Sequence, residues 1–160
     1  MKGDLEIPED DLGGMDMVRK AEIKNMESVA KLAVLMWDKH TVYELVNEFS
    51  EMIVRDKACI FLKYENDVPV GFAQCQLRRD YVEGTETSPV GYLEGIFVRK
   101  DCRKKGYAKE LLAECEAWAK KNGCGEFASD CEIDNRDSFQ FHKAMEFTEV
   151  NRIICFTKKL

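Results

Sequence analysis

One short basic turn constrains the fold of this chain more than any other segment. Residues 103–108 (RKKGYA) stand between an apolar run, residues 92–98 (YLEGIFV), and a segment with apolar residues at helical spacing. This order predicts a strand, a turn and a helix, with unpaired backbone N–H groups at the helix N-terminus that attract a phosphate. Gly106 permits close approach of a phosphate oxygen. The pattern is neither a P-loop nor a GxGxxG turn, and a basic turn that merely caps a surface helix is the alternative.

Composition indicates one small intracellular domain. The chain has 160 residues, so we expect an acidic extension over residues 1–14 and a single domain over residues 15–160. A net charge of −6 without a long basic tract argues against nucleic acid or an anionic membrane as a partner and suits a cationic substrate. Seven cysteines without a Cys-x-x-Cys pair favour reduced core residues and a cytoplasmic location, and two histidines leave little room for a metal site. No apolar stretch approaches the length of a membrane span.

The order of predicted elements is that of an α+β protein. A strand at 18–23 and a helix opened by Asn25 or Ser28 come first, and Thr41 with Glu44 forms a capping box for a second helix through Ile53. Residues 59–64 and 68–77 predict a hairpin. After the strand at residue 92 we expect a helix at 106–121, a strand at 126–131, a helix at 135–145 and a closing strand at 152–157. The β-α-β unit within this order predicts a right-handed parallel crossover.

Arg-x-x-Gly-x-Ala resembles the pyrophosphate-binding turn of the GNAT acetyltransferases. The segments 79–84 (RDYVEG), 88–90 (SPV), 93–98 (LEGIFV) and 126–130 (EFASD), with Asn135 and His142, resemble the aminoglycoside 6′-N-acetyltransferases within that superfamily. The resemblance covers residues 17–159. It implies the GNAT fold, which is a central mixed, mostly antiparallel sheet with splayed parallel strands 4 and 5, flanked by about four helices.

The resemblance also implies an activity. It implies acetyl transfer from acetyl-CoA to the 6′-amine of aminoglycoside antibiotics, without a metal. The amine would attack directly in a ternary complex, and the reaction would confer resistance. Relatives form homodimers, and the closing strand offers an edge for pairing. Two alternatives stay open, namely a GNAT enzyme that acetylates polyamines or another small amine, and a non-catalytic acetyl-CoA-binding protein. The positions that the resemblance assigns to the cofactor are Ile96, Phe97, Val98, Arg103, Lys104, Lys105, Gly106, Tyr107, Ala108, Asn135, Ser138 and His142.

Two carboxylates are the candidate catalytic and substrate-binding groups. Glu94 lies inside an otherwise apolar strand, where an unpaired charge is costly, so it needs a partner. Asp130 follows the next predicted strand, at the carboxyl end where such sheets place ligands. With the resemblance, both would bind ammonium groups, and Asp130 would accept the proton of the 6′-ammonium. A buried ion pair for Glu94 and a turn cap for Asp130 are the alternatives.

Other candidates rest on the resemblance alone. Trp37, His40 and Tyr81 stand where relatives wall the sugar site, although each is also an ordinary packing or surface residue. Asn135 is also explained as a helix N-cap. His142 replaces the tyrosine that many GNAT enzymes use to protonate the leaving thiolate, and helix packing is its alternative. Glu146 stands where a glycine commonly ends the last helix, so it must avoid or tolerate a left-handed conformation.

Overall fold

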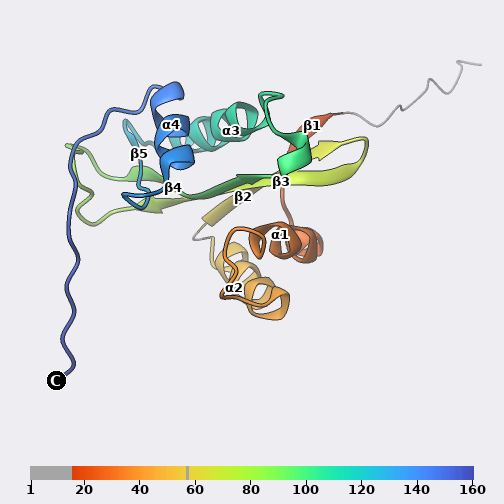
Figure 1. The fold of residues 1–160 in the computed structure, drawn as a ribbon, viewed down its shortest axis with the longest axis horizontal. Helices are drawn as coiled ribbons and strands as arrows, with labels where there is room; N and C mark the ends of the chain where they lie inside the picture. Colours follow the sequence, from red (N-terminus) through yellow and green to blue (C-terminus); the bar gives the residue numbers. More distant parts are fainter. Residues whose placement is uncertain (1–15, 57) are drawn as a thin grey trace, which may run out of the picture.

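A computed structural model describes residues 16–56 and 58–160, and five strands within it form one sheet (Figure 1). The strand order is β1-β2-β3-β4-β5. The first four strands pair antiparallel, and β4 pairs parallel with β5, as the mixed, mostly antiparallel sheet requires. The strands are β1 (Met17–Lys20), β2 (Ala58–Glu65), β3 (Val68–Arg78), β4 (Val90–Val98) and β5 (Phe127–Ser129).

Helices cover both faces of this sheet. Figure 1 shows α1 and α2 on one face, and α3 and α4 on the other. Apolar side chains alternate between the two faces along the central strands, so that Phe72 packs toward α1 and α2 while Ala73 packs toward α3. The helices are η1 (Ile23–Asn25), α1 (Met26–Ala33), α2 (Val42–Val54), η2 (Lys100–Cys102), α3 (Tyr107–Lys121) and α4 (Arg136–Ala144).

Local signals in the sequence set the helix starts. The capping box predicted for α2 is present, because Thr41 Oγ1 accepts from the N–H of Glu44 and the Glu44 carboxylate accepts from the N–H of Thr41. Asn135 caps α4 by accepting from the N–H of Ser138 at 3.1 Å. Gly106 precedes α3 with a φ of 83°, a left-handed conformation that favours glycine.

The predicted splay of the parallel pair is confirmed. β4 and β5 pair only from Gly91 with Phe127 to Leu93 with Ser129. Beyond Leu93, β4 continues for five residues with β3 on one side and no strand on the other side among residues 16–56 and 58–160. The gap therefore opens at Glu94, next to Asp130, which follows the last residue of β5.

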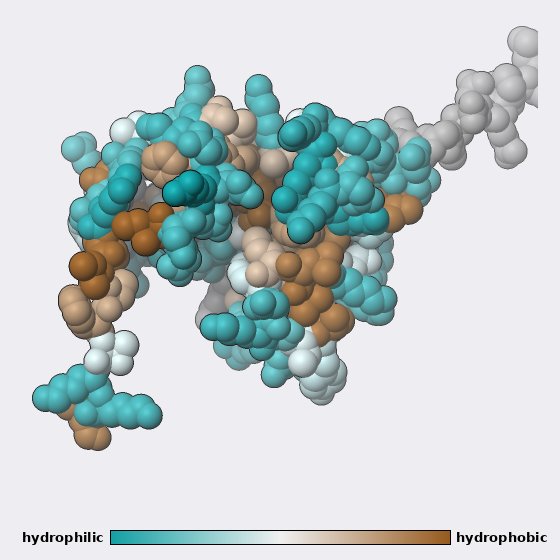
Figure 2. Space-filling view, viewed as in Figure 1, coloured by the Kyte–Doolittle hydropathy of each residue, from teal (hydrophilic) through white to brown (hydrophobic). Residues whose placement is uncertain are grey.

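The predicted closing strand at 152–157 is wrong. Residues 147–160 form no regular structure: Phe147 still packs against His142 and Val150 against Gly84, and the segment beyond them projects from the body of the molecule (Figure 1). The apolar side chains of Ile153, Ile154 and Phe156 are 72%, 80% and 89% exposed. Figure 2 shows apolar side chains along this projecting segment. Its short apolar run suits a strand, but among the described residues the segment pairs with no strand edge.

Smaller differences concern element ends. β1 stops at Lys20, and Ile23, predicted as its last residue, lies in η1. Glu146 adopts a φ of 66°, so α4 ends in the left-handed conformation without a glycine. Of the seven cysteines, Cys131 and Cys155 are the two that are not buried. The predicted extension, residues 1–14, lies outside the described residues, and no helix among the described ones is long and apolar enough to cross a membrane.

Candidate active site

Glu94 is the extra residue of a β-bulge in β4. On β3, Cys75 faces Leu93 and Gln74 faces Gly95, so Glu94 has no partner of its own. Bulges re-aim side chains and are common beside active sites. A Cβ added at Gly95 would lie 2.7 Å from Cζ2 of Trp37, so the indole packs on the backbone next to Glu94. Trp37 thus packs on the residue that directly follows the bulge.

The bulge also reverses the direction of the peptide groups that follow it. The N–H of Gly91 donates to the carbonyl of Glu126 on the β5 side, whereas the N–H of Arg99 donates to the carbonyl of Val70 on the β3 side. In an unbroken strand both groups would face the same side, because direction alternates with each residue. After the bulge, the main-chain groups of Ile96 and Val98 therefore face the open gap and those of Phe97 face β3. The Val98 carbonyl already accepts from Nε of Arg103 at 3.0 Å.

The two candidate carboxylates are held by separate donors. Nε and Nη2 of Arg78 donate to Oε1 of Glu94 at 3.1 and 2.8 Å. The hydroxyl of Tyr92 donates to Oδ2 of Asp130. Burial, followed by this contact with Asp130, raises the pKa of Tyr92, which keeps its hydroxyl protonated at neutral pH. The sequence-based expectation that Glu94 needs a partner is met by Arg78.

His142 joins α4 to the end of β5. Its Nδ1 lies 2.7 Å from the carbonyl oxygen of Ser138 and its Nε2 lies 2.8 Å from the hydroxyl of Ser129. A carbonyl oxygen only accepts, so Nδ1 carries a proton, and in the neutral ring Nε2 accepts from Ser129. The ring also packs edge-on against Phe147. His142 therefore packs within the fold, as the helix-packing alternative expected. Its Nε2 also lies at the point where the parallel strands separate.

The basic turn offers main-chain donors, and of its three basic side chains only Lys105 forms an ion pair among the described residues. Within residues 16–56 and 58–160, the N–H groups from Lys104 to Ala108 have no hydrogen-bond acceptor. A Cβ at Gly106 would meet nothing within 4 Å, so the turn faces open space. The Lys105 ammonium pairs with Glu65 at 2.6 Å. These amides at the start of a 15-residue helix fit a pyrophosphate.

Three predicted residues are not brought into direct contact with the carboxylates. The hydroxyl of Tyr107 meets Asp16 at 3.3 Å and its ring packs in the core, so only its amide faces the turn. Tyr81 is 81% exposed in the loop between β3 and β4, where it meets Glu83. His40 is exposed after the turn that carries Trp37, with its N–H bonded to the Trp37 carbonyl.

Sequence reasoning did not single out Arg78, Tyr92 or Ser129. Arg78 sits near the end of a strand and Tyr92 within an apolar run, so both read as ordinary strand residues. Their positions beside Glu94 and Asp130 depend on the bulge and on the register of β5, which no local pattern encodes. The sequence held one signal for Arg78: Glu94 needed a cation as its partner, and an arginine at the end of a neighbouring strand could supply it.

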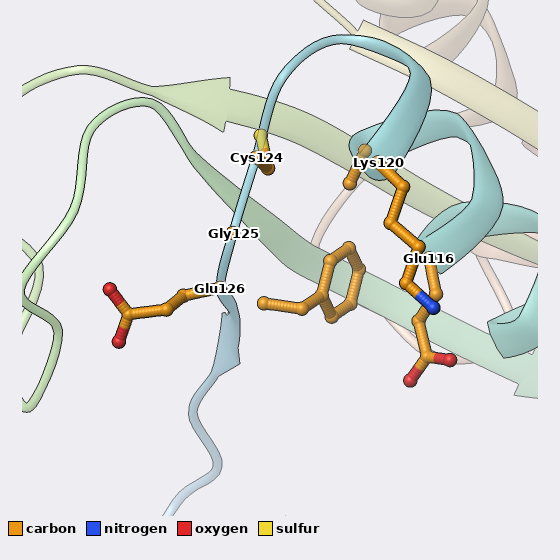
Figure 3. Close-up of a pocket in the computed structure, with 7 residues that line it drawn as sticks. Glu116, Lys120, Cys124, Gly125 and Glu126 are labelled. Carbon is orange, nitrogen blue, oxygen red and sulfur yellow. The ribbon is translucent and has the colours of Figure 1, made fainter.

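A hollow of about 210 Å³ lies elsewhere, beside the start of β5 (Figure 3). It is lined by Glu116, Ala119, Lys120, Cys124, Gly125, Glu126 and Phe127, none of which is a predicted site residue. Figure 3 shows Glu116 and Lys120 on the helix and Glu126 on the strand side. The described residues hold no group of three or more His, Cys, Asp or Glu arranged to bind a metal.

A splayed parallel pair beside a turn with unpaired amides defines an acyl-CoA-dependent transferase. The model of the acetyltransferase (GNAT) family matches residues 23–147, so the acetyl donor is acetyl-CoA. The relatives include aminoglycoside N(6′)-acetyltransferases type 1 from Acinetobacter genomosp. 13 (38% identity, 81% of this chain, 88% of the relative) and Serratia marcescens (36%, 85%, 94%). The chain belongs to this family of GNAT acyltransferases.

Solved structures agree with the sequence relatives. Aminoglycoside N-acetyltransferase AAC(6′)-Iy, in complex with the bisubstrate analogue CoA-S-monomethyl-acetylneamine, superimposes with a TM-score of 0.86 at 33% identity, covering 91% of this chain and 99% of that one. Aminoglycoside 6′-N-acetyltransferase AAC(6′)-Ih from Acinetobacter baumannii gives a TM-score of 0.85 at 33% identity, with the same coverage. These matches confirm the predicted GNAT fold.

Replacing Gly95 tests whether Trp37 belongs to the substrate site. In Gly95→Ala the added methyl overlaps the indole and Cε of Met36, which would lie 3.0 Å away, so we expect Trp37 to shift. Fluorescence in a Trp118→Phe background would report the shift, and KM for the aminoglycoside would rise about tenfold while KM for acetyl-CoA stays unchanged. Gly125→Ala is the control, because its Cβ would meet nothing closer than 3.8 Å. If the fluorescence changes but KM for the aminoglycoside does not, Trp37 is not part of the substrate site.

Proposed function

We propose that the chain transfers the acetyl group of acetyl-CoA to the 6′-amine of aminoglycosides, by direct attack in a ternary complex, and so confers resistance. The observation that carries this proposal is the pair Glu94 and Asp130 at the mouth of the gap between β4 and β5. Two carboxylates beside a gap suited to a thioester arm match a polycationic acceptor better than a neutral one. The similarity to AAC(6′)-Iy, whose complex holds an acetylneamine analogue, supports the same acceptor class.

The cofactor residues divide into two groups in this proposal. The unpaired amides from Lys104 through Ala108 hold the pyrophosphate at the start of α3, with Gly106 allowing close approach and Arg103 preceding them in the turn. Main-chain groups of Ile96 and Val98, which flank Phe97, face the gap and pair with the pantetheine arm. From the side of α4, the N-cap Asn135, Ser138 and His142 would contact the pantetheine arm, since His142 meets Ser129 at the end of β5.

The proton path begins at Asp130. Its carboxylate accepts a proton from the 6′-ammonium, directly or through water, and the freed amine attacks the acetyl carbon. An N–H of β4 near Phe97 that faces the gap donates to the developing oxyanion. As the carbon–sulfur bond breaks, the new amide nitrogen releases its second proton to water, and the thiolate takes a proton from water or, when both nitrogens of the His142 ring carry protons, from His142. The proposal assigns no covalent role to a cysteine, and burial and neighbouring thiols raise the pKa of Cys59 and Cys75 far above the usual range, which makes these two unsuitable as nucleophiles.

Acetylation would weaken the drug through electrostatics. The 6′-ammonium becomes a neutral amide and loses both its charge and hydrogen-bond donors. Aminoglycosides act on anionic RNA, and each cation lost removes phosphate neutralisation. A cytoplasmic location completes the proposal, since cysteines such as Cys131 and Cys155 are free thiols among the described residues.

We also propose a homodimer in which residues 152–160 of each copy pack against the other. The outer edge of β5 has no strand beside it among the described residues, and Ile153, Ile154 and Phe156 are exposed. A short apolar run and an unpaired sheet edge are complementary. In a homodimer, the apolar segment of each copy can pair with the unpaired β5 edge of the other copy.

Two matched antibiotics test the reaction and its position. Kanamycin A carries a 6′-amine and paromomycin a 6′-hydroxyl, so we expect acetyl-CoA-dependent thiol release with kanamycin A and little or none with paromomycin. Equal rates with the two antibiotics would show that an amine other than the 6′-amine is acetylated. Faster turnover of short linear polyamines would favour a small-amine acetyltransferase, and acetyl-CoA binding without thiol release for any amine would favour a non-catalytic protein.

Asp130→Asn tests the catalytic base. The amide cannot accept the ammonium proton, so we expect kcat to fall about 10²–10⁴-fold while KM for acetyl-CoA stays unchanged. Asp134→Asn removes a nearby exposed carboxylate with no side-chain contact among the described residues, and it is the matched control. A loss below threefold in Asp130→Asn would reject the role of Asp130 as base.

Truncation tests the dimer. Removing residues 152–160 deletes the exposed apolar side chains, so light scattering after gel filtration should report a mass of one 18.4 kDa chain less the deleted segment. The uncut chain should report twice the chain mass. Removing only residues 158–160 keeps Ile153, Ile154 and Phe156 and is the control. A truncated protein that remains dimeric would place the interface elsewhere.

A further inference from the structure

The two candidate carboxylates are connected through a stacked pair of side chains. The guanidinium carbon of Arg78 lies 3.4 Å from the centroid of the Tyr92 ring, so the cation sits directly over the aromatic face. Arg78 donates to Glu94, and the hydroxyl of Tyr92 donates to Asp130. The order Glu94, Arg78, Tyr92, Asp130 is thus one continuous series of contacts across the mouth of the β4–β5 gap.

Each carboxylate in this series is held through one oxygen only. Both Arg78 donors converge on Oε1 of Glu94, and Oε2 has no donor among the described residues. Oε2 is also absent from the buried, unpartnered oxygens, so it is open to solvent. The Tyr92 contact uses Oδ2 of Asp130 and leaves Oδ1 open. One oxygen of each acid therefore remains for an ammonium group.

This ion pair differs from a loose surface salt bridge. The side chain of Glu94 is 21% exposed and that of Arg78 is 38% exposed, and Arg78 is fixed by the ring beneath it as well as by the carboxylate. Glu94 is also fixed at its backbone by the bulge. By contrast, the pairs Lys31–Glu27 and Arg55–Glu51 lie on helices with all four side chains more than half exposed.

We propose that Arg78 and Tyr92 are positioning residues that hold Glu94 and Asp130 as one amine-binding pair. This inference rests on the proposed function, because it assigns the open oxygens to substrate ammonium groups. Arg78 keeps the Glu94 carboxylate turned toward the gap, and Tyr92 does the same for Asp130. The positive charge of Arg78 within a site for cations is then needed to orient Glu94, although it also repels the substrate.

The proposal and simple electrostatics predict opposite signs for the loss of Arg78. If Arg78 only repels the polycation, then Arg78→Gln removes an unfavourable charge and the aminoglycoside binds more tightly. If Arg78 orients Glu94, the same change frees the carboxylate to rotate and leaves it without its partner, and binding weakens. Calorimetric binding of kanamycin A to the CoA-loaded protein separates these cases without depending on turnover.

We expect Arg78→Gln to raise the Kd for kanamycin A about tenfold and its KM by a similar factor. Arg78→Lys keeps the charge but loses the flat two-nitrogen contact and the stacking, so we expect an intermediate Kd. Arg79→Gln is the matched control. It removes the same charge one residue along the chain, on a side chain with no contact to Glu94, and should change the Kd less than twofold.

Tyr92→Phe tests the other half of the pair. It keeps the ring under Arg78 and removes only the hydroxyl that holds Asp130, so we expect kcat to fall about tenfold with little change in the Kd for kanamycin A. This split between Arg78 acting on binding and Tyr92 acting on turnover would not arise if both residues merely supported the fold. KM for acetyl-CoA should be unchanged in every variant, and Arg78→Gln should stay folded with a lowered melting temperature, because Glu94 then lacks its partner.

Three outcomes decide the inference. Weaker binding in Arg78→Gln with an unaffected Arg79→Gln supports it. Equal or tighter binding in Arg78→Gln, with a wild-type protein that acetylates kanamycin A, overturns this inference and leaves the proposed function intact. A wild-type protein that neither binds nor acetylates kanamycin A overturns the proposed function, and the assignment of the open oxygens with it.

Discussion

The separation of β4 from β5 after three residue pairs is the constraint on which the rest of the structure depends. Pairing stops at Leu93 and Ser129, and the bulge at Glu94 begins at once. A longer parallel pair would use the main-chain groups of Ile96 and Val98 within the sheet, as parallel ladders do. Because the ladder ends early, those groups remain for a ligand, and the two acids stand on opposite sides of the opening.

Much of the fold could be predicted from the sequence because its signals are local. Thr41 and Glu44 specify a helix start within four residues, and Gly106 marks a conformation that other residues adopt at a cost. The segment 152–157 shows where this reasoning fails. Its short apolar run favours a strand, but such a run does not specify a partner strand, and the segment pairs with no strand among the described residues.

The candidate site was predictable to a similar extent. Glu94 was identified because a charge within an apolar strand needs a partner, and Asp130 because it follows a strand that ends at the ligand edge. Arg78 and Tyr92 could not be identified, because their contacts follow from a one-residue shift in register between β3 and β4. The family resemblance supplied residues such as Trp37 whose contact with the Gly95 backbone is likewise non-local.

The same arrangement explains how the product would leave the proposed site. Each acid keeps one internal donor at all times, Arg78 for Glu94 and Tyr92 for Asp130, so neither becomes an isolated charge when the site is empty. An incoming ammonium adds a second, charge-assisted contact to an open oxygen. Acetylation removes the charge at the 6′ position and with it the stronger part of that contact. The carboxylates keep their internal partners, so affinity falls for the acetylated product but not for the next unmodified molecule.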